Sequence, residues 1–300
     1  EEEPNVESIR SRMREQWSQV HSLHIRLRQE TTFSAETDAM VAWRSRPNLP
    51  KYSGTEDLLF ALDGDKRYSR ILGLECQAIR LPGSRSTEDE PVTQTYDEAR
   101  AWDGMAMRER TKDRGGRFRY RAVAPAEAVD SFPPPEYLMN VGFSPHDPTA
   151  SPKASGQLRR TWFLPAVLES PSYTIAEAIE RIGGKRCLVL QRAGASATAS
   201  TRAASAGLSE DKLWLDMEHG LALWKRELRI DNRLVRVVND DFVQVLPGLW
   251  LPRRSRTEHF APPDAPKQYQ GPPVLVRKMR LTCHNANQVP SDLFEAEQTA

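Results

Sequence analysis

The chain has 300 residues, and its 42 basic and 41 acidic side chains leave a formal net charge of +1. This balance excludes a global field that would draw the chain to nucleic acid or to an anionic membrane, so any such binding must be local. A hydrophobic content of 39% suffices for a sizeable core, and no apolar run approaches the ~18 residues of a membrane-spanning helix.

The chain opens with a pattern typical of a helix. Apolar residues recur at spacings of three and four after Asn5, a residue type that caps helices, at Val6, Ile9, Met13, Trp17 and Val20. From His21 the period becomes two, which predicts a strand that continues to Phe33. A helix that leads directly into a long strand indicates an α+β domain.

The first half then continues as a series of strands. Alternating stretches separated by turn residues predict strands at 39–44, 57–62, 66–72, 92–102, 105–111 and 117–123. Strong hairpin signals lie at Asp63-Gly64-Asp65, Asp103-Gly104 and Gly115-Gly116. These turns predict antiparallel neighbours.

The middle of the chain has a different texture, with many proline and serine residues. Residues 126–129 and 136–141 are predicted to form short helices, and 144–156 to form a flexible loop. Residues 173–181 and 185–191 form a hairpin pattern around Gly183-Gly184. The low-complexity stretch 193–207 is predicted to be a second flexible loop.

The longest run of consistent strand signals covers residues 212–260. Turns at 216–220, 231–232 and 247–248 divide it into a meander. Simple alternation over 224–230 places Trp224, Leu228 and Ile230 on one face. A last strand at 274–283 precedes a tail, 285–300, whose Val289-Pro290 and Leu293-Phe294 are expected to pin it to the body.

Together these elements predict a mainly β, α+β fold. We expect one domain over residues 1–300, with about eleven to thirteen strands in a large curved antiparallel sheet. The sheet is expected to remain an unclosed half-barrel, with the N-terminal helix and short covering helices beside it.

Signatures of catalysis and of cofactor binding are missing from the sequence. It has no GxSxG, HExxH, Walker or GxGxxG motif, so no cofactor and no enzyme activity are predicted. His21 and His24 would form a metal pair only if the helix extended through both, and no metal site is predicted. Cys76, Cys187 and Cys283 lack CxxC spacing, which leaves either three thiols or one disulfide with a free thiol.

A cluster of polar residues lies between two strands of the meander. Asp216, Glu218 and His219 place carboxylates beside an imidazole, which supports acid/base chemistry if the groups converge in a pocket. The same residue types also form ordinary turns through hydrogen bonds to the backbone. We prefer the turn, and keep a hydrolase as a third hypothesis.

A hairpin of the first half is rich in arginine. Arg108, Arg110, Arg117, Arg119 and Arg121 recur at period two on either side of Gly115-Gly116. They form either a ridge for anionic headgroups or a solvated strand face. Nucleic acid is not predicted, because Phe118 and Tyr120 alternate to the face opposite the arginines of their own strand.

Aromatic residues of the strands are the candidate ligand-lining groups. They either fill a closed core or line a cavity for an acyl chain in a wide, curled sheet. The candidates are Trp43, Phe60, Trp102, Trp214, Trp224, Phe242 and Trp250.

The order of these elements resembles a known superfamily. WDG at 102–104, LWLD at 213–216 followed by HGLALWKREL, DDFVQVLPGLWLPRRSR and VPSDLF at 289–294 together resemble the LolA/LolB-like lipoprotein carriers and outer-membrane lipoprotein-sorting proteins. The resemblance implies a half-barrel with an apolar cavity for lipid or the acyl chains of a lipoprotein. It also implies export to the periplasm or cell envelope, with the signal peptide absent from the given chain.

The sequence therefore predicts a non-catalytic envelope protein that carries or senses an apolar ligand, with lipid or lipoprotein acyl chains as partners. The alternative is a binding or scaffolding subunit of a larger envelope assembly, in which the barrel is filled. Neither a transmembrane span nor nucleic-acid binding is predicted.

Overall fold

The structure, a computed structural model, describes residues 5–33, 54–63, 66–79, 90–103, 106–112, 116–123, 173–193, 208–230, 233–263, 265, 267 and 270–294. The chain divides into two compact units. Unit 1 comprises Glu1–His21 and Pro133–Gly271, and unit 2 comprises Ser22–Phe132 and Pro272–Ala300.

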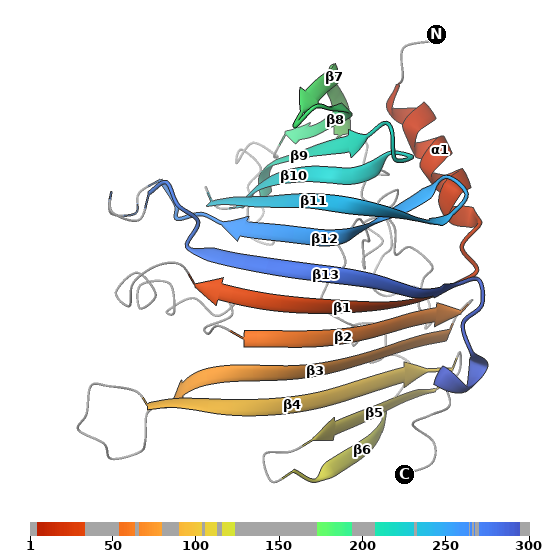
Figure 1. Ribbon diagram of the computed structural model, residues 1–300, viewed down its shortest axis with the longest axis vertical. Coiled ribbons are helices and arrows are strands. Elements are labelled where there is room, and N and C mark those ends of the chain that lie inside the picture. The colour runs from red at the N-terminus through yellow and green to blue at the C-terminus, as the bar shows by residue number, and fades with distance from the viewer. Residues whose placement is uncertain are drawn as a thin grey trace, which may run out of the picture. The chain divides into compact units, whose positions relative to one another are not determined.

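Unit 2 is an antiparallel sheet of consecutive hairpins, to which one strand from the C-terminal part of the sequence is added beside the first strand. Its strands are β1 (Ser22–Phe33), β2 (Gly54–Asp63), β3 (Lys66–Ile79), β4 (Glu90–Trp102), β5 (Met107–Lys112), β6 (Phe118–Val123) and β13 (Leu275–Ala286). They lie in the order β6-β5-β4-β3-β2-β1-β13 (Figure 1). Pairing of β1 with β13 brings together the first and last strands of the unit.

Strand alternation gives this sheet two chemically different faces. One face, called the core face, carries Ile25, Leu27, Phe60, Trp102 and Met107, all buried. The other, called the open face, carries alternate residues such as Arg26, Arg28 and Leu72, all exposed. Because directly paired residues of neighbouring strands share a face, the two faces can be followed across the unit. The core face becomes polar at β5 and β6, where it carries Glu109 and the exposed Arg119 and Arg121.

The C-terminal segment covers one end of the open face. The 3₁₀ helix η2 (Ser291–Phe294) places Phe294, which is 1% exposed, against Ala61, Tyr68 and Ala101. Val289 and Leu293 pack against the same cluster. The expectation that this segment is pinned to the body is confirmed.

Unit 1 combines the N-terminal helix with a second run of antiparallel strands. Its elements are α1 (Val6–Ser18), β7 (Tyr173–Ile182), β8 (Lys185–Ala193), β9 (Leu208–Asp216), β10 (Ala222–Ile230), β11 (Arg233–Leu246) and β12 (Leu249–His259). These strands lie in the order β7-β8-β9-β10-β11-β12 (Figure 1).

Helix α1 begins and packs as its sequence pattern predicts. The Asn5 side chain accepts a hydrogen bond of 2.8 Å from the Ser8 backbone N–H and so caps the first turn. Ile9 and Met13 are buried in a cluster whose strand residues are Tyr173, Leu188, Leu190, Leu213, Leu215 and Leu223, with Leu221 from the β9–β10 turn. Burial of this apolar stripe stabilises a helix too short to be stable alone.

A bulge in β10 changes which residues of that strand share a face. Leu223 pairs with Leu215, whereas Lys225 pairs with Trp214, so one extra residue is inserted in β10. Trp224 stacks on Phe242 on the side of the sheet away from α1. Leu228 instead pairs with Asp211 on the helix side. The prediction that Trp224 and Leu228 share a face is therefore wrong, because simple alternation ignores the bulge.

A buried polar network lies on the helix side of unit 1. Arg226 donates two hydrogen bonds to the Asp211 carboxylate, from Nε at 2.9 Å and from a terminal nitrogen at 2.6 Å. The Tyr173 hydroxyl donates a third at 2.7 Å. Burial alone would lower the pKa of Arg226, but the Asp211 charge and hydrogen bonds outweigh it and raise that pKa. The network therefore remains charged in the core.

The predicted fold class is confirmed. The chain is mainly β, with a large antiparallel sheet that is not closed into a barrel, and α1 is the α-helix among the described residues. The predicted strand at 39–44, the short helices at 126–129 and 136–141, the loop at 144–156 and residues 194–207 lie outside the described residues.

Removal of the Asp211 carboxylate should be costly. Asp211→Ala leaves the Arg226 charge buried without a partner, and we expect the free energy of unfolding to fall by about 3–5 kcal/mol. Tyr173→Phe removes one hydrogen bond and should cost about 1 kcal/mol. Urea unfolding measures both. Asp240→Ala breaks an exposed pair with Arg254 and serves as the control, at about 0–1 kcal/mol. A loss no larger than this control would contradict the prediction.

Candidate functional site

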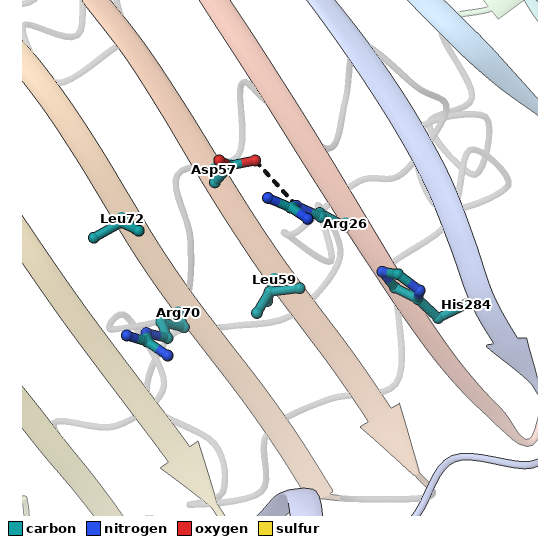
Figure 2. A pocket seen from close by; sticks show the side chains of 6 residues that line it. All are labelled: Arg26, Asp57, Leu59, Arg70, Leu72 and His284. Carbon is teal, nitrogen blue, oxygen red and sulfur yellow. Dashed lines mark hydrogen bonds and ion pairs between the residues drawn. The ribbon is translucent and has the colours of Figure 1, made fainter.

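A pocket of about 350 Å³ opens on the open face of unit 2. It is lined by Arg26, Asp57, Leu59, Arg70, Leu72 and His284 (Figure 2). Its volume lies at the lower end of the ~300–1,000 Å³ that is usual for small-ligand sites. The lining combines aliphatic side chains with basic ones.

The register of three strands sets the order of these groups. Arg26 of β1 is paired with Leu59 of β2, and Leu59 is paired with Arg70 of β3. The leucine therefore lies between two guanidinium groups, as Figure 2 shows. Leu72, two residues after Arg70, is 47% exposed and adds a second aliphatic group beside the first.

Each carboxylate near the pocket is already held by arginine. Arg26 Nε donates a 3.1 Å hydrogen bond to Asp57. Asp97, on β4, accepts hydrogen bonds of 3.0 and 2.8 Å from Arg70 and one of 3.4 Å from Arg110. Burial by itself raises the pKa of Asp97, but Arg70 and then Arg110 outweigh burial, and the pKa lies below its ordinary value. These carboxylates therefore orient the arginines and remain charged.

A bulge brings two histidines together at one end of the pocket. The β1–β13 register shifts between His24 and Ile25. The His24 and His284 rings consequently lie with centroids 4.9 Å apart. Burial, and then the charge of His284, lower the pKa of His24. The neutral form of His24 is therefore favoured near neutral pH.

The predicted lining residues in unit 2 do not lie in this pocket. Phe60, 0% exposed, and Trp102, 4% exposed, are on the core face, opposite the pocket. Trp43 lies outside the described residues. Within the described part of unit 2, the pocket therefore involves none of the aromatic candidates.

Trp214 of unit 1 is held by charged groups on both sides. The ammonium groups of Lys212 and Lys225 lie 4.7 and 4.2 Å from its ring centroid. Its indole N–H donates a 2.6 Å hydrogen bond to Glu180. The side chain is 3% exposed, so this arrangement is typical of a structural tryptophan.

The remaining aromatic candidates form one contiguous cluster in unit 1. Phe242 stacks on Trp224 and on His219, with centroids 5.8 and 5.2 Å apart. Trp250 meets the same histidine edge-on at 4.7 Å. The turn that carries His219 requires glycine at position 220, because a side chain there would collide with the Gly248 carbonyl. The structure thus brings together three of the seven predicted lining residues.

Asp216 and His219 are in direct contact beneath this cluster. Nδ1 of His219 lies 2.7 Å from an Asp216 carboxylate oxygen. The other oxygen accepts a hydrogen bond from the Glu218 backbone N–H at 2.9 Å. The pair meets the distance for acid/base work and forms the predicted turn as well. Cys187 pairs with Asp216 across the strands, and burial followed by the Asp216 charge raises its pKa to about 11, so the thiol is a poor nucleophile.

The arginine-rich hairpin presents its cations on two faces. Arg108 and Arg110 pair with Ala122 and Tyr120 on the open face. Arg119 and Arg121 pair with Thr111 and Glu109 on the opposite one. The hairpin therefore does not bring these residues into one ridge. Arg117 precedes β6 and is exposed.

Sequence reasoning missed Arg26, Arg70, Leu59 and His284 as site residues. Each lies in a predicted strand or next to one, but the pocket depends on pairing between β1, β2, β3 and β13. The available signal was the alternation of basic with aliphatic residues in 23–28. The strand register brings these residues together, and no local sequence pattern specifies that register.

No metal centre or membrane span is found among the described residues. In these ranges, no group of three or more histidine, cysteine, aspartate or glutamate side chains is placed to hold a metal ion. Nor does any described helix have the length and apolar character needed to cross a membrane. Cys187 and Cys283 are free thiols.

Comparisons with known proteins give likenesses of structure only. No family model matches the chain, and no curated protein does. The chain is similar to a DUF1329 family protein from Desulfovibrio piger at 9% identity and a TM-score of 0.48, over 98% of both chains. It is also similar to a LolA superfamily protein from Nitrosomonas europaea, at 12% identity and a TM-score of 0.42, over 97% of both.

A third similar structure is a putative outer membrane lipoprotein-sorting protein domain from Vibrio parahaemolyticus. The identity is 11% and the TM-score 0.44, over 98% of this chain and 99% of that one.

The lowered pKa of His24 predicts a pH dependence of stability. Since its ordinary value is 6.5, the unfolded chain takes up the proton first as pH falls, and stability is lost as pH falls through 6.5 toward the folded-state pKa. His24→Phe keeps an aromatic ring and should reduce the loss between about pH 8 and about pH 5. Thermal unfolding at both pH values measures it. Equal losses in the variant and the parent protein would contradict the prediction.

Proposed function

We propose that the protein is a non-catalytic cell-envelope protein that binds a lipid or the acyl chains of a lipoprotein. The main observation that supports this proposal is the pocket of unit 2, whose lining combines Leu59 and Leu72 with Arg26 and Arg70. Guanidinium groups bind carboxylate and phosphate, whereas the leucines contact hydrocarbon. An acidic amphiphile has both parts in one molecule.

The charge state of the pocket supports an anionic ligand. Arg26 uses Nε for Asp57, and its terminal nitrogens are further hydrogen-bond donors. Two guanidinium groups share the single Asp97 carboxylate. The pocket lining itself contains the guanidinium groups of Arg26 and Arg70 and one carboxylate, that of Asp57, and this balance favours a carboxylate or phosphate headgroup. The sequence resemblance to the LolA/LolB-like superfamily supports the envelope location.

A second candidate function is a scaffolding subunit of an envelope assembly with a filled barrel. The enclosure of Trp214 by Lys212, Lys225 and Glu180 favours it. So does the complete burial of Phe60. In that case the aromatics serve packing and the protein carries no lipid.

Binding of a fluorescent long-chain fatty acid tests the proposal. We expect the protein to bind the probe and Arg26→Gln to weaken binding about tenfold, because one charge-assisted hydrogen bond is lost. Leu72→Ser should weaken binding of the long-chain probe but leave binding of a short-chain carboxylate unchanged. The change is made at a half-exposed position and should not impair folding.

The chain offers a matched control for each substitution. Arg254 donates from Nε to Asp240 at 2.9 Å, as Arg26 does to Asp57 at 3.1 Å. Ile179, 42% exposed, matches Leu72. Arg254→Gln and Ile179→Ser should therefore bind the probe normally. Failure of the parent protein to bind, or equal losses in the controls, would reject the proposed pocket and favour the scaffolding function.

A further inference from the structure

The open face of unit 2 gathers most of the exposed apolar side chains found in the described residues. Leu72, Phe118 and Tyr120 are 47%, 44% and 47% exposed, and the other large exposed hydrophobic residue, Ile179, belongs to unit 1. The register connects them. Arg70 pairs with Ala99, Ala99 with Arg110 and Arg110 with Tyr120, so all lie on one face.

Two arginines on the same face stand directly opposite each other. Arg28 of β1 is paired with Arg280 of β13, and both are exposed. No carboxylate of the described residues forms an ion pair with either side chain. Opposed like charges destabilise a sheet. An anion placed across both strands would relieve this repulsion.

Cations and aromatic rings alternate at the far end of the face. Arg110 and Lys112 lie 4.9 and 5.8 Å from the centroid of the Phe118 ring. In the sequence, Phe118 and Tyr120 are separated only from the arginines of their own strand, β6. The neighbouring strand β5 places Arg110 and Lys112 on the same face as these two rings. Among the described carboxylates of this face, Asp57, Asp97 and Asp103 are paired with arginine, and Glu30 lies opposite Lys278.

We propose that this open face docks onto an anionic phospholipid bilayer. Basic side chains near such a surface each favour binding, and aromatic rings settle at the level of the headgroups. Exposed Leu72 favours a bilayer over single-stranded nucleic acid, because an aliphatic group offers no stacking surface for a base. The docking surface extends beyond the pocket and does not depend on the pocket holding a lipid.

Co-sedimentation with vesicles tests the docking surface. The full chain should bind vesicles of phosphatidylcholine and phosphatidylglycerol in equal parts, and should not bind pure phosphatidylcholine. Arg28→Gln with Arg280→Gln should weaken binding roughly 30-fold, from the usual contribution of two basic side chains. Phe118→Ser with Tyr120→Ser should weaken the part of the binding that remains at high salt, where charge is screened.

The control removes the same charge from unit 1. Arg12 and Arg253 are exposed and form no ion pair with a described residue. Arg12→Gln with Arg253→Gln should bind vesicles like the parent protein. The fatty-acid probe should still bind to the Arg28→Gln, Arg280→Gln protein, which separates this inference from the proposed pocket.

Three outcomes would overturn the inference. They are equal binding to neutral and anionic vesicles, an equal loss in the Arg12 and Arg253 control, and binding of a single-stranded oligonucleotide without binding of anionic vesicles. Loss of the fatty-acid probe alone, with vesicle binding intact, would reject the pocket and leave the docking surface supported.

Discussion

The site in unit 2 depends on one constraint, the strand period of two held in register across neighbouring strands. Residues paired across β1, β2, β3, β4, β5 and β6 share a face, so Arg26, Leu59, Arg70, Ala99, Arg110 and Tyr120 form one row. The adjacent positions in each strand point to the core face, where Ile25 and Phe60 are fully buried. A shift of one residue in any pair would exchange core and site.

Register also explains how the sheets tolerate so many charges. In unit 2, Asp97 lies where two arginines of neighbouring strands reach it. In unit 1, Asp211 plays the corresponding part in a dry environment, where Arg226 and Tyr173 use both of its oxygens. In the first arrangement the Arg70 side chain is 37% exposed and lines the pocket. The second is closed and serves only stability.

The sequence was sufficient to predict α1, the described strands and the fold class, because alternation, turn residues and the helical repeat are local signals. It identified the Asn5 cap and the segment that ends at Phe294 for the same reason. The pocket was not predictable, since Arg26, Arg70 and His284 belong to strands whose pairing is set by the whole chain. The remaining differences between the predicted and the observed positions of side chains arise from bulges. One in β10 separates Trp224 from Leu228, and one in the β1–β13 pair brings His24 beside His284.

The distribution of aromatic residues separates packing from recognition. Phe60, Trp102 and Trp214 are almost fully buried, and the polar atom of Trp214 is already satisfied by Glu180. Phe118 and Tyr120 are nearly half-exposed and lie opposite Lys112 and Arg110 of the neighbouring strand. A half-exposed ring removes less apolar area from water than a buried one, so it contributes less to the core. The tryptophans therefore directed the sequence-based prediction to the interior. Exposure and charge together point instead to the open face of unit 2, the surface proposed to bind a membrane.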